Sequence, residues 1–310
     1  MTNTSALIVE NISKTYAAIK AVDDLSFTVE AGEIFGLLGP KGAGKTTTIR
    51  MILDLIKPDH GTIAVLGGPM AETTKARLGY LPEERGLYQD MTVLDTLLFL
   101  AQLKGLSRHT ARQRAEQALR EVELWDARER KISALSRGMN QKTQFVAATL
   151  HDPDLIIIDE PFSGLDPVNT RLIKKLLYRL RDRGAAIIMS THQMHQVEEM
   201  CQRILLLNHG RALLYGPLAN IRQRFAGNAV EVAVRGDLSC LHLPGIAHIA
   251  PHNGSYRLLL KQGLTPEALL KKLVNQPGLA VQRFEQVAVS LDEIFVRMVS
   301  REVDAGEAAQ

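Results

Sequence analysis

The segment that most restricts how this chain can fold is residues 39–46, which read Gly-Pro-Lys-Gly-Ala-Gly-Lys-Thr. A continuously apolar run, Ile34 to Leu38, precedes it, and a helical pattern from Thr46 to Ile56 follows and stops before Pro58. An apolar run of this kind predicts a strand buried on both faces of a parallel sheet. The chain is therefore expected to place a glycine-rich turn between a central strand and a helix.

A strand, a glycine turn and a helix in this order are the context that a phosphate-binding loop requires. The glycines let successive N–H groups point at phosphate oxygens, and the helix N-terminus adds its positive end. In the motif G-x-x-x-x-G-K-[ST], Lys45 is expected to bridge the β- and γ-phosphates, and Thr46 to offer its hydroxyl to Mg²⁺. The predicted nucleotide-binding residues of this loop are Gly39, Pro40, Lys41, Gly42, Ala43, Gly44, Lys45, Thr46 and Thr47. A chance glycine turn is the alternative for the motif, and an ordinary exposed position is the alternative for the Lys41 side chain.

A second apolar strand, Leu155 to Ile158, ends in Asp159 and Glu160. Ending a buried strand in carboxylates is costly unless they meet a cation. Because consecutive strand residues point to opposite faces, the two acids are expected to have different roles. Asp159 is predicted to join Thr46 as a Mg²⁺ ligand, and Glu160 to polarise the attacking water. The alternative, a pair that only begins the turn at Pro161, is disfavoured because parallel strands bring their carboxyl ends to one edge of the sheet.

The rest of the chain predicts the fold class. Alternating apolar and polar residues from Ala6 to Val29 indicate antiparallel strands, Met91 to Leu150 is mainly helical, and Ala185 to Met189 reads as a third buried strand. The predicted fold is α/β: a P-loop NTPase with a mostly parallel sheet, an antiparallel β subdomain and a helical subdomain over about residues 85–150.

After residue 226 the pattern changes to a small α+β arrangement. The expected elements are strands at Val230–Val234, Tyr256–Leu260 and Leu279–Phe284, a helix at Pro266–Val274, and a helix from Ser290 as N-cap through Met298. The predicted domains are therefore 1–226, the ATP-binding domain, and 227–302, an accessory domain. Residues 303–310 are expected to form a disordered tail.

Charge, cysteines and hydropathy exclude several classes of protein. The formal net charge of +3 gives no reason to expect a nucleic-acid partner, and Cys201 and Cys240 match no metal-ligand spacing. The richest apolar run, Leu97 to Leu103, is too short to cross a membrane, and the first residues lack the layout of a secretory signal. The chain is expected to be cytosolic, with any membrane role supplied by a partner.

Further segments, taken with the phosphate loop, occur in an order that resembles one known family. They are Tyr16; Leu135-Ser136-Arg137-Gly138-Met139; Asp159-Glu160-Pro161-Phe162-Ser163-Gly164-Leu165-Asp166-Pro167; and Ser190-Thr191-His192. Over about Leu7 to Pro217 the chain resembles the ABC ATPase family, in which these places hold an adenine-stacking aromatic residue, the LSGGQ signature, the Walker B segment with its D-loop, and the switch histidine.

The resemblance implies a head-to-tail dimer in which two ATP molecules lie between the phosphate loop of one copy and the signature of the other. It adds Tyr16, Ser136, Gly138 and Asp166 to the nucleotide-binding residues, and makes Glu160, His192 and Lys45 the catalytic set. Each of the added residues has an ordinary alternative. Ser136 fits a plain helix cap, a lone histidine is more often structural, and Tyr16 fits ordinary strand packing.

The sequence departs from the family pattern at three positions. Glu83 stands where the family has a glutamine that touches Mg²⁺, so it is a candidate metal ligand that brings a further negative charge near Asp159 and Glu160. Either its pKa rises or the cation is held more tightly. Arg137 and Met139 replace a glycine and a glutamine of the signature. An active ATPase is still expected, because Ser136 and Gly138 remain.

The segment from Tyr80 to Tyr88, with the extra C-terminal domain, is similar to a bacterial, sodium-exporter-like branch of ATP-binding subunits. This implies an ATPase that drives an ABC exporter as a homodimer or with a paired ATPase, at the inner face of the membrane. Its permease would be a separate chain that docks a short helix on the surface formed by Glu83 to Leu98 and the helical stretch beyond. Four apolar residues there either line the groove for this helix or belong to the core of the helical subdomain: Leu87, Met91, Val93 and Leu97. The alternative is a soluble ABC ATPase acting on ribosomes or nucleic acid, which a single cassette without sustained heptads disfavours.

Overall fold

The computed structural model describes residues 5–84, 86–225, 229–235, 245–252, 254–261, 263–276, 278–287, 289–296 and 298. The chain divides into two compact units, residues 1–215 and 216–310. This division comes earlier than the boundary expected at residue 226, because the helix Leu218–Arg224 (α8) groups with the second unit. The expected tail, 303–310, lies outside the described residues.

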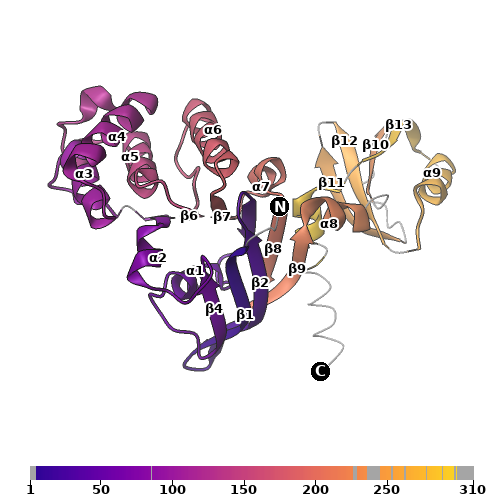
Figure 1. Cartoon of the computed structure of the whole chain (residues 1–310). Coiled ribbons are helices and arrows are strands. Elements are labelled where there is room, and N and C mark those ends of the chain that lie inside the picture. Colours follow the sequence, from indigo (N-terminus) through magenta and orange to yellow (C-terminus); the bar gives the residue numbers. More distant parts are fainter. Residues whose placement is uncertain are drawn as a thin grey trace. The chain divides into compact units, whose positions relative to one another are not determined.

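A six-stranded sheet forms the centre of the first unit, in the order β5-β6-β7-β3-β8-β9 (Figure 1). Its strands are β3 (Ile34–Leu38), β5 (Leu78–Leu81), β6 (Leu155–Asp159), β7 (Ala186–Thr191), β8 (Arg203–Asn208) and β9 (Arg211–Pro217). The strands from β5 through β8 pair in parallel, and every residue of β3, β6 and β7 is buried. The predicted parallel sheet with helices on it is confirmed.

A second, three-stranded sheet has the order β2-β1-β4 and consists of β1 (Ser5–Tyr16), β2 (Ile19–Glu30) and β4 (His60–Val65). All its pairings are antiparallel. Its apolar face shares one core with the parallel sheet, and the rings of Phe27 and Phe35 stack with centroids 5.6 Å apart. Ile49 and Ile52 of the intervening helix join this core, and each such buried side chain contributes about 2 kcal/mol.

The helices are α1 (Lys45–Ile52), α2 (Glu72–Ala76), α3 (Val93–Leu103), α4 (Arg108–Glu121), α5 (Arg137–Thr149), α6 (Pro167–Asp182), α7 (Met194–Met200), α8 and α9 (Pro266–Val274). Side-chain caps start several of them, from Thr92, Ser107, Ser136, Asp166 and Thr265. Helix α1 ends at Ile52 and not at Ile56 as predicted, because Asp54 has a left-handed backbone with φ +60°.

Helices α3, α4 and α5 cluster as the helical subdomain (Figure 1). Of the apolar residues expected either in its core or on its surface, Val93 and Leu97 are fully buried and belong to the core. Leu87 and Met91 are half-buried and remain partly accessible.

The second unit contains a four-stranded sheet in the order β11-β12-β10-β13, with antiparallel pairings. Its strands are β10 (Ala229–Arg235), β11 (Ile246–His252), β12 (Ser255–Leu260) and β13 (Ala280–Gln286). Strand β11 was not predicted. Helix α9 has the predicted bounds and packs on the core through Leu269 and Leu273. Ser290 exchanges hydrogen bonds with Glu293 at the start of the helical residues 291–296.

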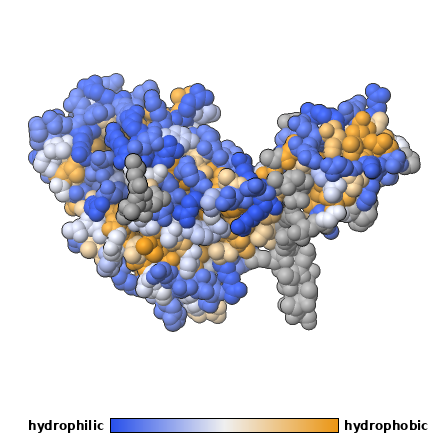
Figure 2. All heavy atoms as spheres, turned by 45° about the vertical axis from the view of Figure 1, so that its right-hand side comes forward, coloured by the Kyte–Doolittle hydropathy of each residue, from blue (hydrophilic) through white to orange (hydrophobic). Residues whose placement is uncertain are grey.

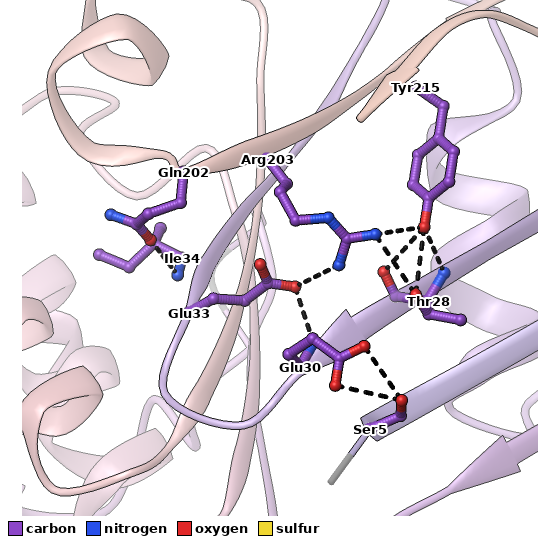
Figure 3. A network of polar contacts seen from close by, with 8 residues as sticks. All are labelled: Ser5, Thr28, Glu30, Glu33, Ile34, Gln202, Arg203 and Tyr215. Carbon is purple, nitrogen blue, oxygen red and sulfur yellow. Dashed lines mark hydrogen bonds and ion pairs between the residues drawn. The ribbon is translucent and has the colours of Figure 1, made fainter. Parts of the chain in front are cut away.

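A polar network fastens the two sheets of the first unit together at the start of β3 and β8 (Figure 3). Arg203 pairs with Glu33 at 3.1 Å and also donates to Thr28 and Tyr215. The Tyr215 hydroxyl in turn accepts from the Thr28 N–H at 3.0 Å. Burial raises the pKa of Glu33, and the adjacent guanidinium of Arg203 opposes that rise. The network places a paired charge where β2, β8 and β9 meet.

Hydrophobic and hydrophilic residues are interspersed on the surface of both units in the view of Figure 2. Within the part of the chain that the structure describes, no helix combines the length and the apolar character needed to cross a membrane.

Candidate active site

The loop between β3 and α1 is shaped by glycines at two places where no other residue fits. Gly39 and Gly44 have φ +146° and +104°. A Cβ on Gly39 would stand 2.4 Å from the Leu207 carbonyl oxygen, and one on Gly44 would stand 2.5 Å from that of Ala21. The loop is therefore pressed between the end of β8 and strand β2, with its backbone fixed by these neighbours.

Lys45 opens α1 and turns back over the loop. Its Nζ donates to the carbonyls of Gly39 at 2.6 Å and Pro40 at 3.0 Å. Burial lowers the pKa of Lys45, while three carboxylates, those of Asp159, Glu160 and Glu83, favour its charged form. The structure thus places the lysine in the electrostatic field of the acids that the sequence nominated.

The other residues of the loop differ in how far they are exposed. Lys41 and Thr46 are exposed and Thr47 is half-buried. Thr48, which the sequence did not single out, is fully buried and donates from Oγ1 to the Gly44 carbonyl at 3.0 Å. It anchors the loop from the helix side.

Asp159 is the last residue of β6 and lies opposite Ser190 of β7 in the parallel ladder. Burial raises the pKa of Asp159, and the neighbouring carboxylates of Glu83 and Glu160 raise it further. The extra acid at Glu83, itself exposed, therefore acts on the buried Asp159. A hydrogen bond from the buried side chain of Ser190 opposes part of this rise. A cation at this edge would stabilise the charged form of the Asp159 carboxylate.

Glu160 lies outside the strand, and this corrects the reason given for its separate role. Its backbone has φ +52°, so it is the first residue of a turn and the alternation of a strand does not apply to it. Its side chain, 8% exposed, accepts hydrogen bonds from Thr191 Oγ1 at 3.0 Å and from the His192 N–H at 3.0 Å. The strained turn aims Glu160 at the segment after β7.

The imidazole of His192 adds a third contact to the Glu160 carboxylate, with Nδ1 2.6 Å from Oε1. The rest of the ring is open, since the His192 side chain is 70% exposed. Thr191 was not among the predicted site residues. Its distance of 31 positions from Glu160 along the chain hides the contact. Together Thr191 and His192 hold one orientation of the carboxylate.

The predicted signature residues lie at the N-terminus of α5. Ser136 is exposed and caps the helix by accepting from the Met139 N–H at 3.3 Å. At Gly138 an added Cβ would meet no atom within 4 Å, so this backbone can be approached from outside. No hydrogen bond among the described residues joins Ser136 or Gly138 to the phosphate loop of the same chain.

Asp166 and Tyr16 lie at the margins of the site. Asp166 is the N-cap of α6 and accepts from the backbone N–H groups of Val168 and Asn169, which hold its pKa below the usual range. In this structure it therefore serves the helix. Tyr16 lies at the end of β1, beside the tight β1–β2 turn, with 46% of its surface exposed, so its ring is available for stacking.

The residues nominated as metal ligands suit Mg²⁺ but do not enclose it. Thr46, Asp159 and Glu83 offer only oxygen, as Mg²⁺ prefers. No group of three or more His, Cys, Asp or Glu residues able to hold a metal occurs in the described part of the chain. Such an open oxygen set matches the way Mg²⁺ is bound in nucleotide sites, where phosphates and waters complete the shell.

Two family models match the chain. Residues 22–163 match the model described as ABC transporter, and residues 216–299 match the one described as ATP-binding protein DrrA1-3-like, C-terminal domain. The first match includes the phosphate loop, Asp159 and Glu160, and the second starts where the second compact unit starts.

Similar proteins match over nearly the whole chain. An uncharacterized ABC transporter ATP-binding protein of Bacillus subtilis, YhaQ, is 37% identical over 94% of this chain and 98% of its own length. The Nod factor export ATP-binding protein I of Burkholderia orbicola is 34% identical over 94% of this chain and 96% of its own. A solved structure described as an ATP-binding subunit of an ABC transporter has a TM-score of 0.68 and 36% identity, covering 71% of this chain and 93% of that one.

Proposed function

The chain belongs to the ATP-binding proteins of ABC transporters and is an ATPase, and on this premise we propose that it drives an exporter through ATP-dependent head-to-tail dimerisation. Proteins of this family work with membrane permeases and dimerise. The observation that carries the proposal is the placement of Glu160, a nearly buried carboxylate oriented by Thr191 and His192 and near Lys45 and Asp159.

In the proposed mechanism the chain binds the triphosphate through the backbone of residues 39–47 and the ammonium of Lys45. Lys45 exchanges the carbonyls of Gly39 and Pro40 for phosphate oxygens, which make stronger charge-assisted hydrogen bonds. Glu160 accepts the proton of the attacking water at its carboxylate. His192 keeps that carboxylate in place by donating from Nδ1, and when the ring carries both protons its Nε2 can donate to the γ-phosphate.

We assign the hydroxyl of Thr46 and the carboxylates of Asp159 and Glu83 to the magnesium shell. Mg²⁺ held by these oxygens would supply positive charge that offsets the negative charge developing on the phosphates. The raised pKa of the buried Asp159 supports this assignment.

One copy of the chain carries the groups for binding, while the signature that completes the site comes from a second copy. At the start of α5 Ser136 is exposed, and Gly138 is half-buried with open space where a side chain would stand. The helix N-terminus favours an anion at this place. Tyr16 is exposed as a stacking ring should be. Asp166, which caps α6, supports the D-loop turn and touches the partner's nucleotide after closure.

The proposed permease dock is an apolar cavity of about 270 Å³ between β5 and the helical subdomain. Leu87, Leu100, Leu103 and Ala147 line it, and 66% of Leu103 is exposed. Exposed aromatic rings of Tyr88 and Phe99 pack edge to face next to it. A short amphipathic helix of a permease would bury these side chains. The dock includes Leu87 of the surface predicted from Glu83 to Leu98, and Leu100 and Leu103 of the helical stretch beyond it.

The proposed direction, export, is supported by the name of one relative that matches nearly the whole chain, the Nod factor export ATP-binding protein I. We place the chain at the inner face of the cell membrane, held there by its permease. No feature of the described residues favours a ribosome or nucleic acid as the partner.

Co-expression with a candidate permease, a multi-span protein encoded next to this chain, tests the proposed function. The chain should be recovered with membranes only when that protein is present, and Leu103→Glu should abolish the recovery without changing ATP hydrolysis by the chain alone. Leu55→Glu is the matched control, because Leu55 is 65% exposed and lies outside the cavity lining. Recovery with ribosomes, or equal loss in both variants, would contradict the proposal.

A further inference from the structure

The first residue of α5, Arg137, reaches the turn that follows Glu160. Its Nη2 donates to Ser163 Oγ over 3.1 Å. The guanidinium also lies against Gly164, where an added Cβ would stand 2.1 Å from Nε and 2.5 Å from Cζ of Arg137. Gly164 has φ +75°, so it presents bare backbone to the arginine. Arg137 fills the space that any side chain at position 164 would need.

Two further hydrogen bonds connect this contact to the proposed base. The Ser163 N–H donates to the Glu160 carbonyl over 3.2 Å, so Ser163 lies in the turn that Glu160 begins. One helical turn beyond Arg137, the nearly buried Gln141 donates from Nε2 to the Pro161 carbonyl over 3.5 Å. Helix α5 therefore holds residues 161–164 from two positions on the same face.

A polar cavity of about 210 Å³ borders the same contact, lined by Glu83, Glu84, Arg137, Asn140, Gln144 and Ser163 among others. Among the described residues that line it, Arg137 alone is positively charged. Asn140 Oδ1 and Gln144 Oε1 are buried and have no hydrogen-bond partner within the described chain. A space of this size with unpaired acceptors can hold water. Between α5 and the turn there is thus a loosely filled region, and Arg137 and Gln141 carry the connection across it.

We propose that Arg137 is a positioning residue for ATP hydrolysis, which fixes the turn after Glu160 to the start of α5. The inference rests on the proposed function, because that function gives Glu160 the role of base and the α5 N-terminus its contact with nucleotide on a second copy. When Ser136 meets that nucleotide, any movement of α5 passes through Arg137 to Ser163 and to the Glu160 carbonyl. Closure of the dimer and alignment of the base then occur together.

A double-mutant cycle with Arg137→Ala and Ser163→Ala tests this role. Each single variant should lower kcat about three- to tenfold, because each removes the same charge-assisted hydrogen bond, and the double variant should be no slower than the slower single one. The KM for ATP should stay within about twofold, since the phosphate loop is untouched. Arg137→Lys should recover part of the rate, and thermal stability should be unchanged. Arg112→Ala, which removes an exposed arginine of α4, is the matched control.

Three results would overturn the inference. Multiplying losses in the double variant would mean that Arg137 and Ser163 act separately. If Arg137→Ala raised the KM for ATP while Ser163→Ala left both kcat and KM unchanged, the arginine would contact phosphate instead. A lower melting temperature with unchanged kcat would make the contact merely structural. Failure of the proposed function would give a different result: the Glu160→Gln variant, with Arg137 and Ser163 intact, would hydrolyse ATP at the parental rate.

Discussion

Replacement of Glu160 by glutamine removes the charge of the proposed base with little change of shape. The carboxylate accepts from the Thr191 hydroxyl at one oxygen and from the His192 N–H and ring at the other. A glutamine can keep its oxygen toward His192 and turn its NH₂ to Thr191, whose hydroxyl can also accept. The hydrogen bonds are therefore conserved in number, and we expect a loss of stability of no more than about 1 kcal/mol.

The rate should fall much more than the stability. A general base contributes about 10²- to 10⁴-fold, which corresponds to about 3–5 kcal/mol of transition-state stabilisation. Nucleotide affinity should change little, because Lys45 and the loop carry the binding. The ATP-bound dimer should therefore accumulate in the variant.

Steady-state phosphate release, binding of a fluorescent ATP analogue and light scattering with and without ATP measure these three quantities. Glu116→Gln, at an exposed pair on α4, is the control for loss of an acid. Turnover at the parental rate in Glu160→Gln would refute the assignment of the base. If Glu160→Gln instead lost nucleotide binding and had a lower melting temperature, the contacts of Glu160 with Thr191 and His192 would be needed for folding. Glutamine would then not be a neutral replacement for Glu160.

Two further predictions concern stability. Arg203→Met should lower the free energy of unfolding by about 3 kcal/mol, because it leaves the nearly buried Glu33 without its cation. In urea unfolding, the double variant with Glu33→Gln should recover most of this loss. Equal stability of the single and double variants would show that the pair is not coupled. Burial lowers the pKa of His151 to about 4, so the folded chain binds this proton less tightly than the unfolded chain does. The free energy of unfolding should therefore fall by up to about 3 kcal/mol as the pH drops from about 6.5 toward 4. His151→Gln should make this decline smaller. An equal decline in the parent and in the variant would refute the role of His151.

Local sequence signals predicted the elements that depend on neighbouring residues. Thr265 and Pro266 define the start of α9 by capping and by proline's fixed φ, and the structure has the predicted bounds. The apolar run before residue 39 predicted a fully buried strand, and β3 is one. Strand β11 gave no such signal, because Pro251 and two histidines interrupt its apolar pattern.

Contacts between distant positions were beyond the reach of the sequence. The alternation argument separated Asp159 from Glu160 for the wrong reason, since the chain leaves the strand at Glu160 through a left-handed turn. Thr191 entered the site only through the pairing of β6 with β7, and Arg137 met Ser163 only through the packing of α5. Such contacts depend on tertiary structure, and the residues next to each position in the sequence do not predict them.

The hydrogen bonds from Lys45 to the carbonyls of Gly39 and Pro40 affect which ligands the loop can bind. A ligand must outcompete two backbone oxygens for one ammonium group. A neutral nucleoside offers the ammonium no charged acceptor, whereas a polyphosphate offers several. The loop is therefore expected to select its ligand first by negative charge.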